Sequence, residues 1–106
     1  VLAGDVVPAK KPAPDIYLLA LARLGVPATE CIVVEDSRNG LLAAVAAGLA
    51  TVVTVNGYTR EEDFSEAALV VSSLGDPGAE PIEILANRSA ATPAGYVTLT
   101  DLEACL

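Results

Sequence analysis

Two short apolar runs on either side of a helix-like segment constrain the fold of this chain more than any other feature. The runs are residues 31–34 and 51–55, and neither follows the strict alternation of a half-buried strand. Runs of this kind, rich in β-branched residues, are typical of strands covered on both faces in a parallel sheet. Between them, apolar residues recur at helical spacing from Leu41 to Leu49, and Gly48 is a suitable helix end. A strand, a helix and a strand in this order predict a right-handed crossover in an α/β sheet.

Other segments extend this pattern in both directions. Residues 13–24 predict a helix, because Pro14 suits a first helical turn and Gly25 suits a C-terminal stop. Residues 69–71 predict a third, short strand, and Val6–Val7 is interpreted as the end of a strand that enters from before residue 1. The pattern therefore predicts more than one crossover of the same kind.

The character of the sequence changes after Leu74. Before that point, the acidic run Glu61–Asp63 predicts the start of a solvated helix. Beyond it, residues 79–95 carry scattered Pro, Ala, Ser and Thr with little periodicity. We therefore divide the chain into residues 1–78, the core part, and residues 79–106, an irregular C-terminal extension with a short helix expected at its end. Thr100 and Glu103 have the spacing of a capping box for that helix.

Composition excludes several classes of function. The chain has 106 residues, with 6 Lys plus Arg against 14 Asp plus Glu, a net charge of −8. This balance argues against nucleic-acid partners, since binding to the phosphate backbone depends on cations. There is no His, which removes Ser-His-Asp and Cys-His catalysis and His-ligated metals, and no apolar stretch reaches the roughly 18 residues of a membrane span. Catalysis must therefore come from carboxylates, Lys, hydroxyls, backbone amides or an oxygen-bound metal.

The segment that carries the most chemistry is Glu35-Asp36-Ser37, which directly follows the first buried strand. Ligands of open α/β sheets bind beyond the carboxyl ends of the strands, where Glu35 and Asp36 are expected. Two adjacent carboxylates make best sense opposite a cation, and oxygen ligands without His favour Mg²⁺ over Zn²⁺. The alternative interpretation is a solvated acidic loop before a helix that Ser37 caps.

A second candidate is the pair Lys10-Lys11, which stands just before the helix at residues 13–24. A Lys at this place is suited to bind a phosphate or a charged carboxylate as a compact point charge. The alternative is an exposed basic loop.

Together the two segments resemble the motifs of the haloacid dehalogenase (HAD) superfamily. Lys11, in Lys-Pro-x-Pro-Asp-x-Tyr, matches the third motif of that superfamily, and Glu35-Asp36, followed by Ser-x-x-Gly, match the fourth. The CbbY-like branch, close to β-phosphoglucomutase, contains sugar-bisphosphate phosphatases of photosynthetic cells. The chain resembles this branch over about residues 3–78. The matching segments are Gly4-Asp5-Val6-Val7, Val34 to Leu41, Gly57-Tyr58-Thr59 and Leu74 to Pro77.

This resemblance implies a Rossmann-like parallel sheet with flanking helices and an active site at the strand ends. It implies that Asp36 is a direct Mg²⁺ ligand and that Glu35 is a second or water-mediated one. Lys11 would steady the phosphate and the phosphorylated carboxylate. Ser37 and Asn39 would hydrogen-bond near the site, although a helix cap explains Ser37 equally well.

The family's first motif, Asp-x-Asp-x-Thr, supplies the nucleophile and the general acid/base, and it does not occur in these 106 residues. The second-motif Ser or Thr and the helical cap domain lie upstream in the family as well. We therefore expect an incomplete HAD-type sheet that lacks the N-terminal strand, the first motif and the cap, and a chain that is inactive alone.

The function that follows is the C-terminal half of a Mg²⁺-dependent phosphatase. It would act on sugar phosphates or bisphosphates through an aspartyl-phosphate whose nucleophile lies upstream of Val1. The alternative is a non-catalytic half-domain that serves as a structural or interaction subunit. In either case the open sheet edge calls for the missing N-terminal half or another protein chain. The resemblance and two unpaired cysteines, Cys31 and Cys105, predict a reducing compartment, the chloroplast stroma or a bacterial cytoplasm.

Overall fold

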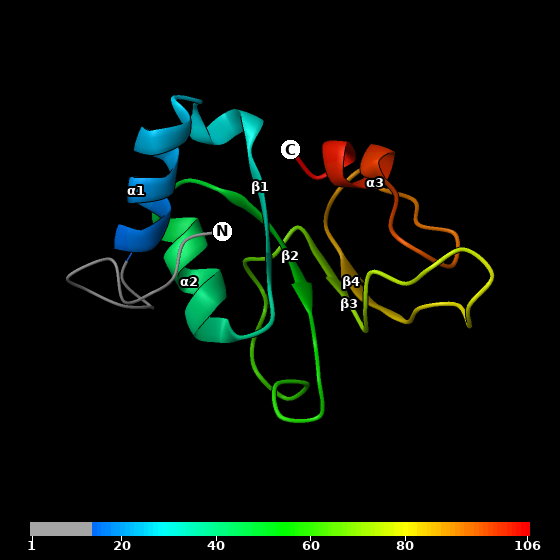
Figure 1. Ribbon diagram of the computed structural model, residues 1–106. Helices are drawn as coiled ribbons and strands as arrows, with labels where there is room; N and C mark the ends of the chain where they lie inside the picture. Colours follow the sequence, from blue (N-terminus) through cyan, green and yellow to red (C-terminus); the bar gives the residue numbers. More distant parts are fainter. Residues whose placement is uncertain (1–13) are drawn as a thin grey trace.

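The computed structural model describes residues 14–106, and every structural statement below concerns this part of the chain. The expected strand end at Val6–Val7 and the motif residue Lys11 lie outside it. Figure 1 shows the elements, which in chain order are α1 (Asp15–Leu24), the 3-10 helix η2 (Ala28–Glu30), β1 (Ile32–Glu35), α2 (Arg38–Ala46), β2 (Ala50–Thr54), β3 (Leu69–Val71), β4 (Ile84–Asn87) and α3 (Leu99–Ala104).

The four strands form one mixed sheet in the order β1-β2-β3-β4. β1 pairs with β2 in parallel, with Ile32 opposite Ala50 and Glu35 opposite Val53, and α2 crosses between them. β2 and β3 are also parallel, whereas β3 and β4 are antiparallel. The predicted α/β fold with a parallel crossover is therefore confirmed. Because β1 and β2 run the same way, their carboxyl ends lie at the same edge of the sheet, which is the lower edge in Figure 1.

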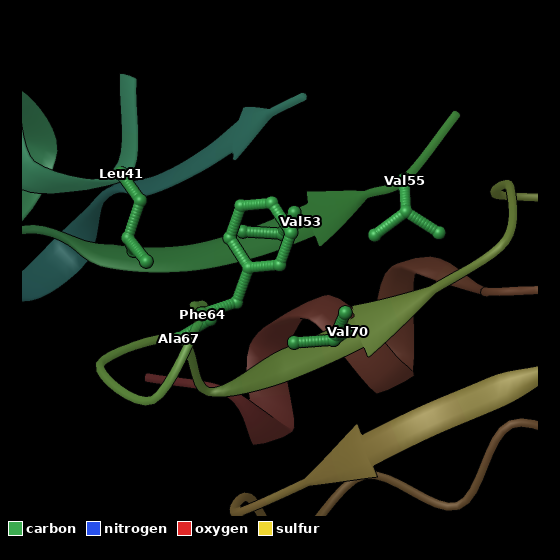
Figure 2. Packing of buried hydrophobic residues seen from close by; sticks show 6 residues of the cluster. All are labelled: Leu41, Val53, Val55, Phe64, Ala67 and Val70. Atoms are coloured by element: carbon green, nitrogen blue, oxygen red, sulfur yellow. The ribbon is translucent and has the colours of Figure 1, made fainter. Parts of the chain in front are cut away.

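One face of the sheet packs against α2 and the connection between β2 and β3. Its buried cluster joins a helix residue, Leu41, to Val53 of β2 and Val70 of β3, and Phe64 fills the space between them (Figure 2). Leu41 and Val53 are completely buried. Burying an aliphatic side chain of this size contributes about 2 kcal/mol, so this contact holds α2 and hence its N-terminus against the sheet.

The other face is covered by the last part of the chain, which contains more regular structure than we expected. Val52 and Leu69 point to this face, where they form a buried cluster with Ala91 and Cys105. Residues 79–95 include the strand β4, hydrogen-bonded to β3, and residues 98–104 end in the capped helix α3. The prediction of an irregular extension is therefore wrong for β4. This strand is mostly exposed and owes its conformation to backbone pairing with β3, so its sequence shows no periodicity.

Local signals at the helix ends were informative except at two places. Gly25 ends α1 with φ at 69°, a left-handed conformation that favours glycine. The box that caps α3 joins Thr98 to Asp101, so the expectation for Thr100 and Glu103 is wrong. Glu61–Asp63 is wrong as a helix start, since residues 57–62 form turns and a bend. No helix among residues 14–106 is both long and apolar enough to cross a bilayer.

Candidate functional site

The two candidate metal ligands occupy different environments at the carboxyl end of β1. Glu35 is the last residue of the strand, and only 7% of it is exposed. Asp36 follows it into the connection to α2 and is exposed. The strand end predicted for this pair is therefore confirmed, and it presents one carboxylate at the surface and one below it.

The side chain of Glu35 turns back over the first turn of α2, where it lies against Gly40. A Cβ atom built on Gly40 would overlap Oε1 and Cδ of Glu35 and would lie 3.0 Å from Oε2. Gly40 is itself buried. The absence of a side chain at residue 40 thus creates the space that the Glu35 carboxylate occupies.

Ser37 begins α2 as its N-cap. Its Oγ accepts a hydrogen bond of 3.1 Å from the backbone N–H of Gly40, so its role as a cap is confirmed. Asn39 lies exposed in the first turn of α2. A phosphate contact by Ser37 or Asn39 stays a prediction. The expected approach of Lys11 to Asp36 also stays a prediction, because Lys11 is outside the described residues.

A hollow of about 820 Å³ lies beside these carboxylates. Its walls are mainly apolar side chains of α1 and β1, and Tyr17, Glu35, Asp36 and Thr54 are polar residues in its lining. Such a lining suits contact with further polypeptide better than it suits a phosphate group alone.

Glu35 and Asp36 offer the right type of ligand for a divalent cation, but two carboxylates are too few to fill its coordination sphere. Both offer the oxygen ligands that Mg²⁺ prefers. Within residues 14–106, however, no three His, Cys, Asp or Glu side chains gather closely enough to hold a metal ion. A magnesium site built on Glu35 and Asp36 therefore requires waters, substrate oxygens or ligands from elsewhere.

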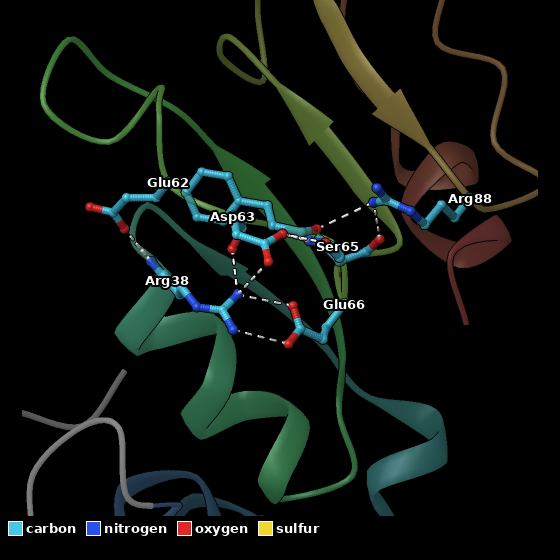
Figure 3. Close-up of polar contacts among 8 residues, drawn as sticks. Arg38, Glu62, Asp63, Ser65, Glu66 and Arg88 are labelled. Carbon is cyan, nitrogen blue, oxygen red and sulfur yellow. Dashed lines mark hydrogen bonds and ion pairs between the residues drawn. The ribbon is translucent and has the colours of Figure 1, made fainter.

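Arg38, the first residue of α2, makes contacts that the sequence analysis missed (Figure 3). Its guanidinium donates to the backbone carbonyl of Asp63 at 2.6 Å and to the carboxylate of Glu66 at 3.1 and 3.4 Å. Its backbone N–H donates to Oε1 of Glu62 at 2.7 Å. Glu62, Asp63 and Glu66 thus bind the start of α2 instead of belonging to a helix. Charge complementarity between Arg38 and this acidic run was the one signal in the sequence.

The contacts in this cluster favour the charged forms of Arg38 and Asp63. Hydrogen bonding to Glu66 raises the pKa of Arg38 above its usual value, with a smaller contribution from Asp63. Hydrogen bonds from Ser65 lower the pKa of Asp63, and the positive charge of Arg38 lowers it further. Near neutral pH Arg38 and Asp63 are therefore both charged.

Comparison with known proteins agrees with this geometry. Residues 1–48 match the family model of haloacid dehalogenase-like hydrolases. Over these residues the chain is similar to that family. The fourth-motif carboxylates Glu35 and Asp36 lie within the matched segment.

Relatives narrow the assignment to the CbbY-like branch. A CBBY-like protein of Arabidopsis thaliana is 52% identical over 84 residues, 79% of this chain and 26% of that protein. Phosphoglycolate phosphatase of Escherichia coli (strain K12) is 40% identical over 78 residues, 72% of this chain and 31% of that enzyme. The chain thus spans between a quarter and a third of the length of these relatives.

The sheet of this CbbY-like chain also has a match among solved structures. CbbY from Rhodobacter sphaeroides, crystallised with phosphate, superposes with a TM-score of 0.65 at 51% identity, over 67% of this chain and 32% of that one. A mutant of the same protein was crystallised with xylulose-(1,5)bisphosphate. The α/β fold of the chain is therefore the CbbY fold over the matched part.

Proposed function

We propose that this CbbY-like chain supplies the metal- and phosphate-binding part of a Mg²⁺-dependent phosphatase of sugar phosphates or bisphosphates. The observation that carries the proposal is the carboxylate pair Glu35–Asp36 at the strand end, with Glu35 fitted against Gly40. The relatives support the substrate class, since the related CbbY protein was crystallised with phosphate and with a sugar bisphosphate.

In this proposal each motif residue has one task. Asp36, exposed at the strand end, and Glu35, buried beside it, hold Mg²⁺, which when bound neutralises charge on the phosphoryl oxygens. Lys11 binds the transferred phosphoryl group as a positive charge. Ser37 and Asn39 add hydrogen bonds near the phosphate, in the case of Ser37 through whatever capacity its capping bond leaves.

The nucleophile of this proposal lies outside the sequence. Attack on phosphorus by a carboxylate requires an aspartate placed for it, and the Asp-x-Asp-x-Thr motif does not occur in the 106 residues. We infer that the 106-residue chain alone does not hydrolyse sugar phosphates.

The apolar hollow beside β1 supports a further polypeptide partner. Among the described residues, β1 pairs with β2 on one side only. We propose that the N-terminal half or another protein chain covers this edge and the hollow. Under the division proposed for the sequence, residues 1–78 carry the core and residues 79–106 complete its second face. Two free cysteines, Cys31 and Cys105, are consistent with a reducing chloroplast or bacterial compartment.

The test is phosphate release from a panel of sugar mono- and bisphosphates, with Mg²⁺ or with EDTA. We expect the 106-residue chain to release no more phosphate than buffer. We expect a version that carries an Asp-x-Asp-x-Thr segment ahead of residue 1 to turn over with Mg²⁺ only. Metal-dependent turnover by the 106-residue chain would contradict our assignment of the nucleophile. No turnover by the longer version would favour the alternative, a structural or interaction subunit.

A further inference from the structure

Three arginines bind the connection between β2 and β3, residues 55–68, to the rest of the structure. Arg38 reaches it from α2, and Arg88, just after β4, donates to the carbonyls of Phe64 at 3.2 Å and Ala67 at 3.1 Å. Arg60 lies within the connection and pairs with Glu83 at 2.6 and 2.7 Å. Of the four basic residues within 14–106, only Arg23 takes no part. The connection is therefore held from three sides by charge-assisted bonds.

Arg38 differs from the other two because it also borders the candidate site. Only Asp36 and Ser37 separate it from Glu35, the last residue of β1. Both flanks of this two-residue segment are fixed: Glu35 is buried against Gly40, and Arg38 is bound by its backbone N–H and its guanidinium. The exposed Asp36 thus lies in a two-residue segment between Glu35 and Arg38, both of which are held by tertiary contacts.

The bonds of Arg38 have a defined direction. Its two terminal nitrogens face the two carboxylate oxygens of Glu66, and the side chains of both residues are only 35% exposed. A planar guanidinium paired in this way fixes geometry that a single point charge does not. An error of about 1 Å in the position of a ligand or catalytic group is enough to weaken a site substantially.

We propose that Arg38 is a positioning residue, which through Glu66 and Asp63 holds the segment of Asp36 in the conformation that binds the divalent cation. The inference rests on the proposed metal site at Glu35 and Asp36. It adds that the metal site and the β2–β3 connection are one mechanical unit, joined by an ion pair at the surface.

The probe is Mn²⁺, which binds oxygen ligands as Mg²⁺ does and broadens the NMR signals of nearby amides. The amide signals of Asp36 and Ser37 are followed in the 106-residue chain over millimolar Mn²⁺, with Mg²⁺ as competitor. We expect Arg38→Gln and Glu66→Gln to raise the Mn²⁺ concentration for half-broadening at least threefold. Arg38→Lys is expected to lie between Arg38→Gln and the unchanged chain.

The matched control is Arg60→Gln, which releases the same connection from Glu83 without touching the segment of Asp36. We expect its half-broadening concentration to equal that of the unchanged chain. An equal rise in Arg60→Gln and Arg38→Gln would overturn the inference, because any loosening of the connection would then have the same effect. If Arg38→Gln does not fold, Glu66→Gln decides alone.

The two possible failures are distinguishable. If Mn²⁺ does not broaden Asp36 and Ser37 in the unchanged chain, the proposed metal site fails and the inference falls with it. If Mn²⁺ broadens these signals in the unchanged chain, and Arg38→Gln and Glu66→Gln have the same half-broadening concentration as the unchanged chain, the metal site stands. The positioning role of Arg38 is then overturned.

Discussion

The carboxylate of Glu35 occupies the space that a side chain at residue 40 would fill, so the strand end and the first turn of α2 fit together through Gly40. Glu35 comes from β1 and Gly40 from α2, and both are buried. This contact places a carboxyl group beneath the surface next to the exposed Asp36. The lack of a side chain at residue 40 therefore sets the space that is open to the Glu35 carboxylate.

Gly40→Ala is expected to displace the Glu35 carboxylate while the fold survives. The atoms that collide with the new Cβ are the far end of a flexible side chain, which moves at low cost. Alanine is also up to about 1 kcal/mol more favourable than glycine inside a helix. We expect the free energy of unfolding to change by less than about 1 kcal/mol in urea titrations. The Mn²⁺ concentration that half-broadens Asp36 should rise severalfold.

The control for this variant is Gly57→Ala, where a Cβ meets no atom within 4 Å. It should leave the Mn²⁺ response unchanged. Unchanged Mn²⁺ binding in Gly40→Ala would show that the position of Glu35 does not matter for the metal.

Asp36→Asn is expected to weaken divalent-cation binding by replacing a charged ligand with a neutral one. Mg²⁺ is bound through carboxylates and loses its waters reluctantly, so the loss of one charge is costly. In a version that carries the Asp-x-Asp-x-Thr segment, the half-saturating Mg²⁺ concentration for phosphate release should rise at least tenfold. Full activity of Asp36→Asn at the original Mg²⁺ concentration would defeat the metal assignment. Asp76→Asn, in an exposed turn, is the matched control.

Lys11→Ala is expected to lower turnover by removing the cation that stabilises charge on the transferring phosphoryl group. The loss of one electrostatic contact of this kind typically reduces kcat by about 100-fold or more. Lys10→Ala is the matched control, since the neighbouring lysine matches no motif position. The measurement is kcat for phosphate release by the same longer version, and an equal loss in both variants would show a general effect of the basic segment.

The elements that the sequence predicted well are those whose signal is local. β1 and β2 contain the β-branched runs 32–34 and 51–54, and Ser37 and Gly25 are helix boundaries recognisable from residue type. The prediction that Glu35 and Asp36 lie at the carboxyl end of β1 followed from the same strand signal and is correct.

The features that escaped prediction depend on tertiary structure or on competing local signals. Arg38 meets Glu66 across 28 residues, and no local rule pairs them. For α3, both Thr98 and Thr100 have an acidic residue three positions later, and the usual preference for glutamate pointed to the wrong threonine. The fit of the Glu35 carboxylate against Gly40 depends on the turn between strand and helix, which sequence spacing alone does not supply.

The buried carboxylate of Asp101 makes the end of the chain sensitive to acid. Its Oδ2 accepts hydrogen bonds from the backbone N–H of Thr98 at 3.0 Å and from the hydroxyl of Thr98 at 2.9 Å. Its Oδ1 accepts another from the N–H of Thr92 at 3.2 Å. These bonds, above all the one from the backbone of Thr98, lower the pKa of Asp101.

A carboxylate whose pKa is lower in the folded state stabilises the fold above its unfolded pKa, near 3.9. This contribution is lost as pH falls through the lower, folded value. Asp101→Asn is expected to cost about 1 kcal/mol at pH 6, the order of a helix-capping interaction, because Asp101 is the N3 partner of the N-cap Thr98. It is also expected to leave unfolding less dependent on pH between about 5 and 3. The measurement is the free energy of unfolding in urea at each pH, with Asp76→Asn as control. An unchanged pH dependence in Asp101→Asn would show that acid unfolds the chain through other carboxylates, of which Asp63 is the first to test because its pKa is also lowered.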